Sequence, residues 1–540
     1  MEYRRGANDE IRDRSSAGLF GITPLITGKP GVTGTGNSIA SLLLGEVNSV
    51  TEQVSDLIRS RAAYWAGYVQ DDWRLTDRLT LNYGLRWETE IPRSVVDNRQ
   101  NSFDPAGINP VSGTPGVVTF AGVNGTPRQA FRTDWNNFGP RFGFAYRLPS
   151  SRETVIRGGG GAFYGPTVSN TIGDVASTGF STALNLVVPQ ADVQSALRLR
   201  DGVPVYKRPA LNAGFGAAAP GQKPYTQVGF LKPDQDTPIS YQFNFNVQRE
   251  VARDVVIETG YMSNVSHHLT ANDLTLNQVR PELMGGGDAQ ARRPFPQFSN
   301  VYWINPAIGN SSYHAGYVKA EKRFSKGVSF LAHYTFSKFI DDVASSVEYG
   351  DPASYLDAYN RRLDKSLSAS DVPHRFVAGA LYETPRWNGL LGAALGGWKL
   401  GGVATMQSGK PFTVVMVANT TNAFIAGPLR PDLVGDARAG VSTLARFFNT
   451  AAFRAPAQFQ FGNSPRSVLR GASYSTVDTT FEKEFPVKER YRFNLRAELF
   501  NILNHANFDA PGHTLGAADF GVVSSARPAR TVQLGARVSF

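Results

Sequence analysis

Two pairs of neighbouring carboxylates are the first candidates for chemistry in this chain. Asp71–Asp72 and Asp341–Asp342 each place two acids side by side, the residue type that general acid–base catalysis uses. Both pairs stand at the ends of runs in which apolar and polar residues alternate. We therefore interpret them as solvated end charges. The chain also lacks the D-x-[DN]-x-[DN]-G pattern of a calcium loop.

Histidine, serine and cysteine give no stronger catalytic pattern. His267 and His268 are adjacent, and adjacent side chains on a strand point to opposite faces, so we expect an exposed loop pair rather than a shared metal. The sequence contains no G-x-S-x-G elbow. It has 0 Cys, which removes disulfides, Cys-ligated zinc, Fe–S clusters and Cys nucleophiles. The sequence therefore predicts no enzyme, no cofactor and no metal site.

A glycine-rich segment is the remaining candidate for ligand chemistry. GGGGAFYG at 158–165 suggests a phosphate loop, but it lacks the Lys-Ser/Thr pair that a P-loop needs. It also lies inside a strand pattern rather than before a helix. We expect a closely packed strand there.

Composition limits the class of protein. The 540 residues hold 55 Lys+Arg and 45 Asp+Glu, a net charge of +10, without a block of five or more basic residues. A nucleic-acid partner is therefore not expected. The most apolar stretches, including SIASLLLG at 38–45, are too short for a membrane-spanning helix. A closed β-barrel would still satisfy every backbone group in a membrane.

The elements that must position these residues are strands. Apolar and polar residues alternate most clearly at 79–87, 241–248, 491–499 and 532–540. The apolar residues that we expect to face lipid are Leu79, Leu81, Tyr83 and Leu85 in the first run, and Phe243, Phe245 and Val247 in the second. Trp65, Trp73, Trp87 and Trp398 lie near run ends and are expected in interfacial girdles.

The spacing of the runs decides between a soluble sandwich and a barrel. Short turns join the runs in pairs, and loops of about 30 to 70 residues, uncommon in compact soluble domains, separate the pairs. The expected pairs are 64–74 with 78–89, 138–148 with 153–165, 238–250 with 254–263, 313–325 with 328–339, 373–384 with 395–407, and 474–485 with 488–500. The sequence therefore predicts an all-β, antiparallel outer-membrane β-barrel wall of about 14 strands, counting the fragment EYRR, with short periplasmic turns and long external loops.

Seven segments resemble, in order, the barrel strands of TonB-dependent receptors, most closely the Oar-like group. They are 68–88, 136–148, 241–261, 320–338, 371–385, 396–412 and 495–508. The resemblance covers nearly the whole chain. It implies the outer membrane of a Gram-negative-type bacterium and a complete barrel of about 22 strands. In the motif DVPHRF, we expect His374 and Arg375 to make a structural contact at the lumen edge.

The resemblance also implies partners. A final strand ending in an aromatic residue, here Val532, Leu534, Ala536, Val538 and Phe540, would be read by the barrel-assembly machinery. Other expected partners are outer-membrane lipid, an unknown substrate and the TonB complex, the last through a missing N-terminal region. The charged segment 1–30 has no apolar h-region. We therefore expect residues 1–540 to be the C-terminal portion of a receptor without signal peptide, regulatory-like domain or plug, forming a partial or open barrel.

The leading hypothesis for function is a TonB-dependent uptake receptor for a large or scarce substrate. The alternative is a surface-binding or adhesion protein that uses the barrel only as an anchor. A third hypothesis, a secreted soluble β-enzyme, would need a convergent acid pair that the sequence does not supply.

Overall fold

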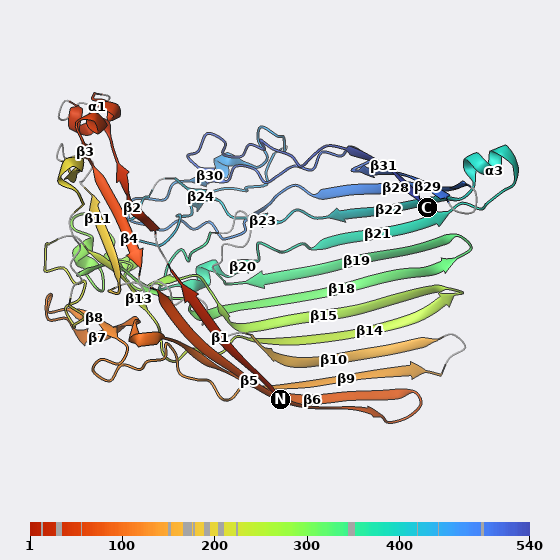
Figure 1. The fold of residues 1–540 in the computed structure, drawn as a ribbon, viewed down its shortest axis with the longest axis horizontal. Coiled ribbons are helices and arrows are strands. Elements are labelled where there is room, and N and C mark those ends of the chain that lie inside the picture. Colours follow the sequence, from red (N-terminus) through yellow and green to blue (C-terminus); the bar gives the residue numbers. More distant parts are fainter. Residues whose placement is uncertain are drawn as a thin grey trace.

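One large antiparallel sheet dominates the structure, and its strands follow one another in chain order (Figure 1). The computed structural model describes residues 1–11, 14–28, 35–55, 57–149, 153–165, 175, 179–187, 195–203, 210–222, 225–343, 352–417, 419–440, 442–487 and 491–540. The strands of the large sheet, in order, are β1 (Glu2–Glu10), β5 (Ile58–Arg74), β6 (Leu79–Val95), β9 (Phe138–Leu148), β10 (Thr154–Tyr164), β14 (Ile239–Ala252), β15 (Val255–Thr270), β18 (Ala307–Ser325), β19 (Val328–Asp341), β21 (His374–Glu383), β22 (Trp398–Gln407), β28 (Tyr474–Val487), β29 (Tyr491–Phe500) and β31 (Thr531–Ser539), with β20 (Ser366–Leu367) beside β19.

The predicted strand pairs are confirmed, because each expected pair of runs forms an antiparallel hairpin of this sheet. The expected fragment at the start is a nine-residue strand, β1, and several strands extend beyond the predicted bounds on the long-loop side. The longer link between β21 and β22 contains helix α3 (Gly389–Leu395). The β9–β10 and β28–β29 turns include residues 150–152 and 488–490, which lie outside the described residues.

The long loops gather at the opposite end from the short turns (Figure 1) and form small sheets of their own. Their strands are β2 (Arg14–Gly21), β3 (Glu46–Val47), β4 (Ser49–Ser55), β7 (Asn101–Ile108), β8 (Pro115–Phe120), β11 (Ser181–Val187), β12 (Leu197–Arg198), β13 (Thr226–Phe230), β16 (Leu274–Thr275), β17 (Phe298–Trp303), β23 (Pro411–Phe412), β24 (Val415–Met416), β25 (Asp432–Leu433), β26 (Phe453–Arg454), β27 (Leu469–Arg470) and β30 (Thr514–Leu515). Short helices in these loops are α1 (Ser38–Leu43), η1 (Pro24–Thr27), η2 (Val96–Asn98), η3 (Leu199–Asp201), η4 (Pro281–Leu283), η5 (Gln290–Arg292), η6 (Arg361–Asp364) and η7 (Thr450–Ala452). Among the described residues, no helix is long and apolar enough to cross a membrane.

Most of the apolar core lies in the loops, and the large sheet contributes mainly through the long-loop ends of its strands, such as Ile58 and Val95. One cluster packs Phe103, Phe120 and Phe298 with neighbouring aliphatic residues, and a second packs Phe412, Phe448 and further loop residues. By contrast, many large apolar side chains of the sheet are exposed. A sheet that leaves its apolar face uncovered needs an apolar environment on that face.

The large sheet has two open edges. Its hydrogen-bonded path ends at β1 and β31, and in the described residues these two strands do not pair with each other. The β1 register on β5 stops at Glu2 opposite Ala66, so 67–74 of β5 lie beyond the span of β1. The described sheet is therefore an open wall, and the larger barrel of which we expect it to be a part stays a prediction.

Candidate functional surfaces

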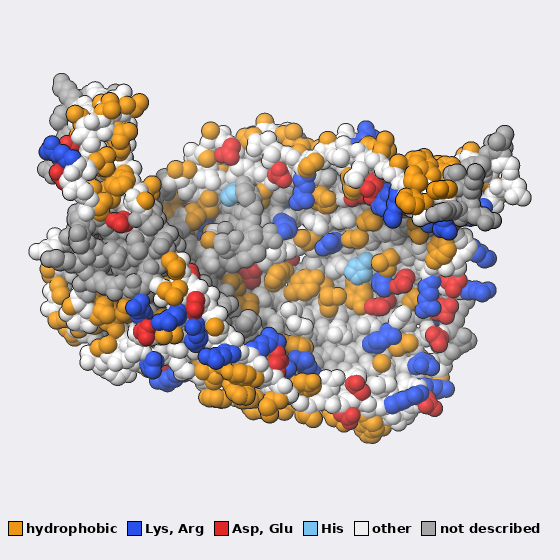
Figure 2. Space-filling model, viewed as in Figure 1, with side chains coloured by type: hydrophobic (Ala, Val, Ile, Leu, Met, Phe, Trp, Pro, Cys, Tyr) orange, Lys and Arg blue, Asp and Glu red, His pale blue; other side chains and the backbone are white. Residues whose placement is uncertain are grey.

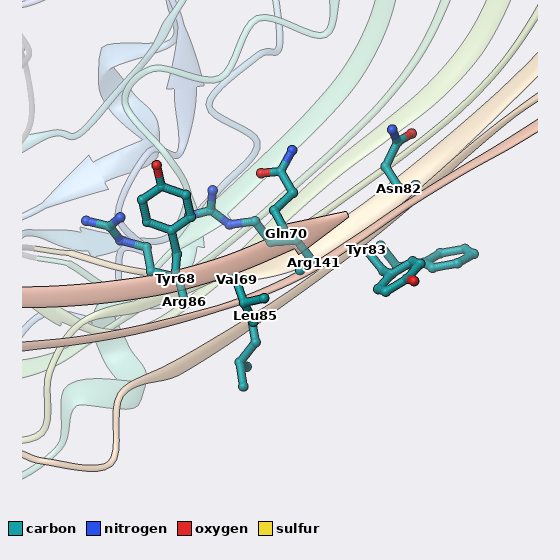
Figure 3. Close-up of a pocket in the computed structure, with 11 residues that line it drawn as sticks. Tyr68, Val69, Gln70, Asn82, Tyr83, Leu85, Arg86 and Arg141 are labelled. Atoms are coloured by element: carbon teal, nitrogen blue, oxygen red, sulfur yellow. The ribbon is translucent and has the colours of Figure 1, made fainter. Parts of the chain in front are cut away.

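The large sheet has two chemically different faces because successive side chains of a strand alternate. Figure 3 shows this at β5, β6 and β9, where Gln70, Asn82 and Arg141 project on one side of the sheet and Val69 and Leu85 on the other. The space-filling view looks onto the hollowed side, and charged side chains gather there towards the short-turn end (Figure 2).

The expected lipid-facing residues share one continuous face. Leu81 lies opposite Phe144 of β9, Phe144 opposite Gly158 of β10, and Gly158 opposite Phe245 of β14. The other members of the set, Leu79, Tyr83, Leu85, Phe243 and Val247, occupy the same alternate positions of β6 and β14. The register therefore brings the two predicted sets together, and their contact with lipid stays a prediction.

The glycine run confirms the expectation of a close-packed strand. Residues 158–161 lie within β10. A Cβ built on Gly158 would come within 2.7 Å of the Phe144 ring, and one on Gly160 within 2.5 Å of the Phe243 ring. The glycines therefore make room for aromatic rings from the strands on both sides.

The four expected girdle tryptophans lie at two heights. Trp73 is near the β5–β6 turn and Trp398 begins β22, both at the short-turn end, whereas Trp65 and Trp87 lie further along their strands. Trp65 stands eight residues from Trp73, about 27 Å along a strand and about 20 Å along the axis of a tilted barrel. That separation is close to the roughly 25 Å apolar band of outer-membrane barrels.

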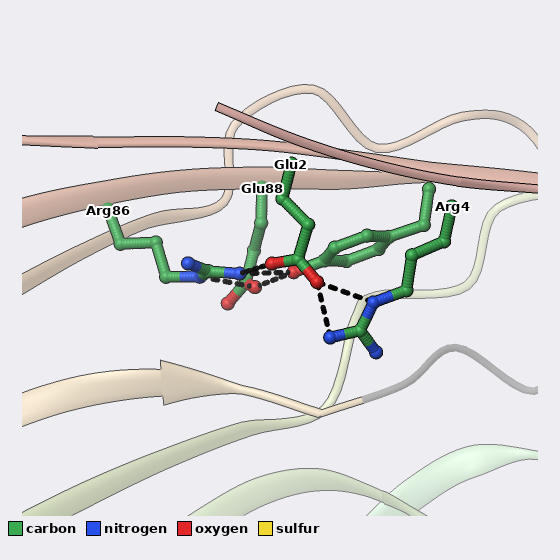
Figure 4. A network of polar contacts seen from close by, with 5 residues as sticks. Glu2, Arg4, Arg86 and Glu88 are labelled. Atoms are coloured by element: carbon green, nitrogen blue, oxygen red, sulfur yellow. Dashed lines mark hydrogen bonds and ion pairs between the residues drawn. The ribbon is translucent and has the colours of Figure 1, made fainter.

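Polar side chains form hydrogen-bonded networks on the polar face of the sheet. This is the hollowed side seen in Figure 2, and we call it the inner face. Arg86 is the centre of one of these networks (Figure 4): its guanidinium lies 3.0 Å from carboxylate oxygens of both Glu2 and Glu88, and it donates to the Tyr64 hydroxyl at 2.9 Å. Glu2 also pairs with Arg4, and Tyr64 donates to Glu88. The network joins β1, β5 and β6, so it fixes the first strand of the sheet to its neighbours.

An apolar patch, which we call the apolar island, lies on this otherwise polar face. Leu331 lies opposite Gly379, Gly379 opposite Val403, and Leu381 opposite Gly401, which puts the three large residues on the same face as Glu321. Leu331, Leu381 and Val403 are 46%, 39% and 49% exposed. An apolar patch on a face that is otherwise polar suggests that protein, and not only water, contacts it.

Asp341 and Asp342 are not solvated end charges, so that expectation was wrong. Asp341 pairs with Arg466, which is 1% exposed, and Asp342 accepts hydrogen bonds from the backbone and side chain of Asn310. Periodicity could not show this, because Arg466 is more than a hundred residues away in the sequence. Asp71 and Asp72 are exposed and accept from Tyr83 and Asn82 on opposite faces of the sheet.

Two further ion pairs, one buried and one partly buried, join the same two loops. Asp364 lies 3.3 Å from Arg430, with both side chains at most 2% exposed, and Asp371 pairs with Arg470. Desolvation raises the pKa of Asp364 and lowers that of Arg430, so burial opposes the charged forms. Like the Asp341 pair, these contacts link the β19–β21 segment to the β22–β28 loop. We call this packed assembly of long loops the loop layer.

The β15–β18 loop belongs to the loop layer as well. Gln278, fully buried, donates to Asp357 at 2.7 Å. Arg293 donates to the Asn277 backbone carbonyl at 2.8 Å and stacks over Phe424 at 4.3 Å. Burial lowers the pKa of Arg293 to about 10. The β15–β18, β19–β21 and β22–β28 loops are thus held together by contacts between residues far apart in the sequence. No single segment of the sequence predicts these contacts.

A pocket of about 520 Å³ opens where these three loops meet. It is lined by Asn272, Asp273, Tyr302, Ile304, Asn305, Ala353, Ser354, Ala426, Gly427 and Pro428. Asp273 is held in place by the Asn305 backbone N–H at 2.9 Å. Burial and the nearby Asp273 charge raise the pKa of Tyr302, so its hydroxyl stays protonated at neutral pH. The pocket offers amide, hydroxyl and carboxylate groups to a polar ligand.

The histidines correct two sequence-based expectations. His267 and His268 are a half-buried pair within β15, not an exposed loop pair, and His268 has a φ of 57° at a register shift. His374 lies opposite Phe336, on the apolar face, and not at the lumen edge. Arg375, the next residue, takes the polar face. In the part of the chain that the structure describes, no group of three or more His, Cys, Asp or Glu could hold a metal ion.

The final strand has the expected alternation. Val532, Leu534, Ala536 and Val538 lie opposite Leu499, Ala497, Leu495 and Phe493 of β29, and Phe540 follows the strand, 87% exposed. These residues line one face of an unpaired edge. Their recognition by assembly machinery stays a prediction.

Comparisons with known proteins complete this description. A sequence model of the family described as outer membrane beta barrel domain matches residues 1–533. None of the curated proteins matches the chain. Similar solved structures include the ferripyoverdine receptor of the outer membrane of Pseudomonas aeruginosa (10% identity, TM-score 0.43, covering 94% of this chain and 41% of that one), the outer membrane transporter YddB from Escherichia coli (10%, 0.41, 91% and 59%) and the ferric yersiniabactin uptake receptor FyuA from Yersinia pestis (12%, 0.39, 91% and 50%). The chain spans about two fifths to three fifths of the length of these proteins.

Proposed function

This chain belongs to the outer membrane β-barrel domain family, and we propose that it forms the barrel wall of a TonB-dependent receptor that imports a large or scarce substrate. Family membership confirms the predicted outer-membrane barrel and its location. The proposal adds active uptake, the TonB partner and a substrate that binds at the loop layer.

The apolar island on the inner face is the observation that supports the proposal best. In a water-filled channel, Leu331, Leu381 and Val403 would expose apolar surface to solvent, which is unfavourable. A further domain of the same protein, filling the lumen, would cover them. A filled lumen passes substrate only when the filling moves, and we propose that the TonB complex supplies the energy for that movement.

The open edges support a second part of the proposal, that residues 1–540 are the C-terminal portion of a longer barrel. Strands β1 and β31 each present an edge whose N–H and C=O groups would cost several kcal/mol apiece if left unpaired in lipid. Additional strands of the same protein would satisfy both edges.

The loop-layer pocket is the proposed substrate contact. It lies at the junction of three loops, and Tyr302 and Ser354 offer hydroxyl groups beside the Asp273 carboxylate. The buried Asp364–Arg430 pair belongs to the same layer. A rigid layer would keep the pocket preformed, which lowers the entropic cost of binding.

Uptake by cells tests the proposal directly. Cells that carry the complete gene, cells that lack it, and gene-carrying cells treated with a protonophore are given a mixture of solutes too large for porins. Untargeted mass spectrometry then follows depletion of the medium. We expect one class of solute to disappear only with the gene and an energised membrane. Binding that the protonophore does not change would favour the anchor alternative instead.

A single-cysteine variant tests the filled lumen. Because the chain has 0 Cys, Leu381→Cys creates a unique thiol on the inner face. In the complete gene product, with any cysteine outside residues 1–540 replaced, this thiol should react with a membrane-impermeant maleimide much more slowly than the same thiol in the 540-residue chain alone. Equal reactivity of Leu381→Cys in the long and short proteins would contradict a lumenal domain at this position.

A further inference from the structure

Three basic side chains gather on the outward face of the neighbouring strands β18, β19 and β21. His314 lies opposite Lys338 in the β18–β19 pair. His374 lies opposite Phe336, two residues from Lys338. Through the register of β14, β15 and β18, Phe336 belongs to the same face as Phe245, which we propose to face lipid. We call His314, Lys338 and His374 the basic cluster, and all three are exposed.

The basic cluster stands at one height on the wall. Lys338 is ten residues beyond Val328, where β19 leaves its short turn, and His314 and His374 lie at similar distances from the short-turn ends of β18 and β21. At about 3.4 Å per residue and a tilt of about 40°, this is about 25 Å from the turns. That height is where the apolar band ends and the external headgroup layer begins.

Two tyrosines orient the histidines of the cluster. The Tyr261 hydroxyl lies 2.7 Å from Nδ1 of His314, and the Tyr334 hydroxyl lies 2.7 Å from Nδ1 of His374. When each hydroxyl donates to Nδ1, the neutral imidazole has its proton on Nε2. Both rings stack on their tyrosines, which directs the Nε2–H donors away from the tyrosine hydroxyls.

The acidic residues of these strands lie on the face opposite the basic cluster. The carboxylates of β15, β18, β19 and β21 all occupy the inner face, at Glu258, Glu321, Asp341 and Glu383. Lys338 makes no ion pair among the described residues. The outward face of four strands therefore presents positive charge and N–H donors without any carboxylate to neutralise them.

We propose that the basic cluster binds the phosphate groups of lipid headgroups in the outer leaflet. Phosphate supplies the negative charge and the acceptor oxygens that Lys338 and the two Nε2–H groups lack in the protein, and it lies at the height of the cluster. Tyr261, Tyr334 and Phe336 would contact the upper part of the acyl chains. The inference depends on the outward orientation of this face but not on TonB-dependent transport.

Lipid binding by the full chain, refolded in neutral detergent micelles, tests the proposal. Native mass spectrometry measures binding of diphosphoryl lipid A, of the same lipid with both phosphates removed, and of inorganic phosphate alone. We expect phosphate-dependent binding of the lipid, about fivefold weaker for Lys338→Ser, and at the level of the dephosphorylated lipid when His314→Ser and His374→Ser are added. A heat-modifiability gel confirms that each variant is folded.

The inner face supplies a matched control. Lys319 and His333 lie opposite each other on the same strands, β18 and β19, but face the lumen. Lys319→Ser with His333→Ser should leave lipid binding unchanged. Equal loss in this pair, retention of lipid by the folded triple variant, or full displacement of lipid by inorganic phosphate would each overturn the proposal. If the triple variant does not fold, Lys338→Ser and Lys338→Glu decide by the same criteria.

Discussion

Neighbouring residues of one strand lie on opposite faces of the sheet. A charged substitution should therefore destabilise the folded protein much more at one position than at the next. On β6, Leu81 belongs to the apolar face and Asn82 to the polar face. Leu81 lies opposite Trp73 near the short-turn end, where Leu81→Arg should lower the free energy of unfolding by only about 0–1 kcal/mol. Leu85 lies on the same face opposite Val69, midway between Trp73 and Trp65, so Leu85→Arg should lower it by about 2–4 kcal/mol. Asn82→Arg should cost much less than Leu85→Arg. Guanidinium unfolding in lipid vesicles, followed by the mobility of folded and unfolded protein on gels, measures all three.

The neighbouring residues Phe245 and Asn244 allow the same test on a second strand, β14. Phe245→Arg should behave like Leu85→Arg, and Asn244→Arg like Asn82→Arg, because the register joins Phe245 to the face of Leu81 and Leu85 and places it away from the short turns. A penalty for Leu85→Arg or Phe245→Arg as small as that for the polar-face variant of the same strand would contradict the assignment of the lipid-facing set.

The buried pairs of the loop layer give a second prediction at the scale of single residues. Asp364→Ala leaves the Arg430 charge buried without its partner, which should cost about 3–5 kcal/mol. The double variant Asp364→Leu with Arg430→Met should recover much of that loss, because it removes both charges. The rate of proteolysis within the loop layer measures the effect.

An exposed ion pair is the control for this experiment. Arg74 and Asp77 pair at 3.1 Å with their side chains 69% and 96% exposed, so Asp77→Ala should change stability by less than about 1 kcal/mol. Faster cleavage of the double variant than of Asp364→Ala would show that the buried charges themselves, rather than their mutual compensation, stabilise the layer.

At the scale of elements, the glycine run of β10 determines how closely three strands pack. Gly160→Ala places a Cβ 2.5 Å from the Phe243 ring and 3.0 Å from the Gln242 carbonyl oxygen, an overpacking that should cost about 1–3 kcal/mol. Gly67→Ala on β5 meets nothing within 4 Å and should be nearly neutral. The temperature at which folded protein loses its distinct gel mobility compares the two. A neutral Gly160→Ala would mean that the rings move aside freely.

The strands could be predicted from sequence because their signal is local. Period-two alternation and short turns located β14, β29 and the short-turn end of β6 to within a few residues. The extra length of β5 on the long-loop side, from Ile58 to Ala63, has no comparable alternation. The two-residue strands of the loop layer are too short to have a periodic signal at all.

The contacts of the loop layer could not be predicted, because they join residues far apart in the sequence. Asp341 resembles an ordinary charge at the end of a strand until the fold brings Arg466 to it. His374 was misplaced for a different reason: a motif shared with other barrels does not state which face its residues take, whereas the Phe336 register does. The candidate pocket around Tyr302 likewise exists only after three loops have packed.

At the scale of the whole molecule, the sheet and the loop layer should respond differently to acid. His513 of the β29–β31 loop packs beside Phe412, which brings this loop into the loop layer, and burial lowers the pKa of the His513 imidazole from the ordinary 6.5. The unfolded layer therefore binds a proton at pH values where the folded layer does not. Its free energy of unfolding should fall as the pH decreases from about 6.5 towards the depressed pKa.

Limited proteolysis between pH 8 and pH 5 measures this response. Cleavage within the loop layer should accelerate at the lower pH while the gel mobility of the folded sheet persists. His513→Phe removes the titrating group and should flatten that part of the profile. An unchanged profile in the variant would assign the acid sensitivity to other groups.

The strands of the large sheet follow one another in chain order, and this affects how the number of strands in such barrels can change during evolution. Each hairpin pairs only with the hairpins before and after it, from β5–β6 to β28–β29. A gene duplication or deletion that covers one hairpin would therefore leave every other strand with a neighbour of the same kind. The number of strands in a barrel can therefore change by two without altering the order of the other strands. This agrees with the even strand numbers of bacterial barrels.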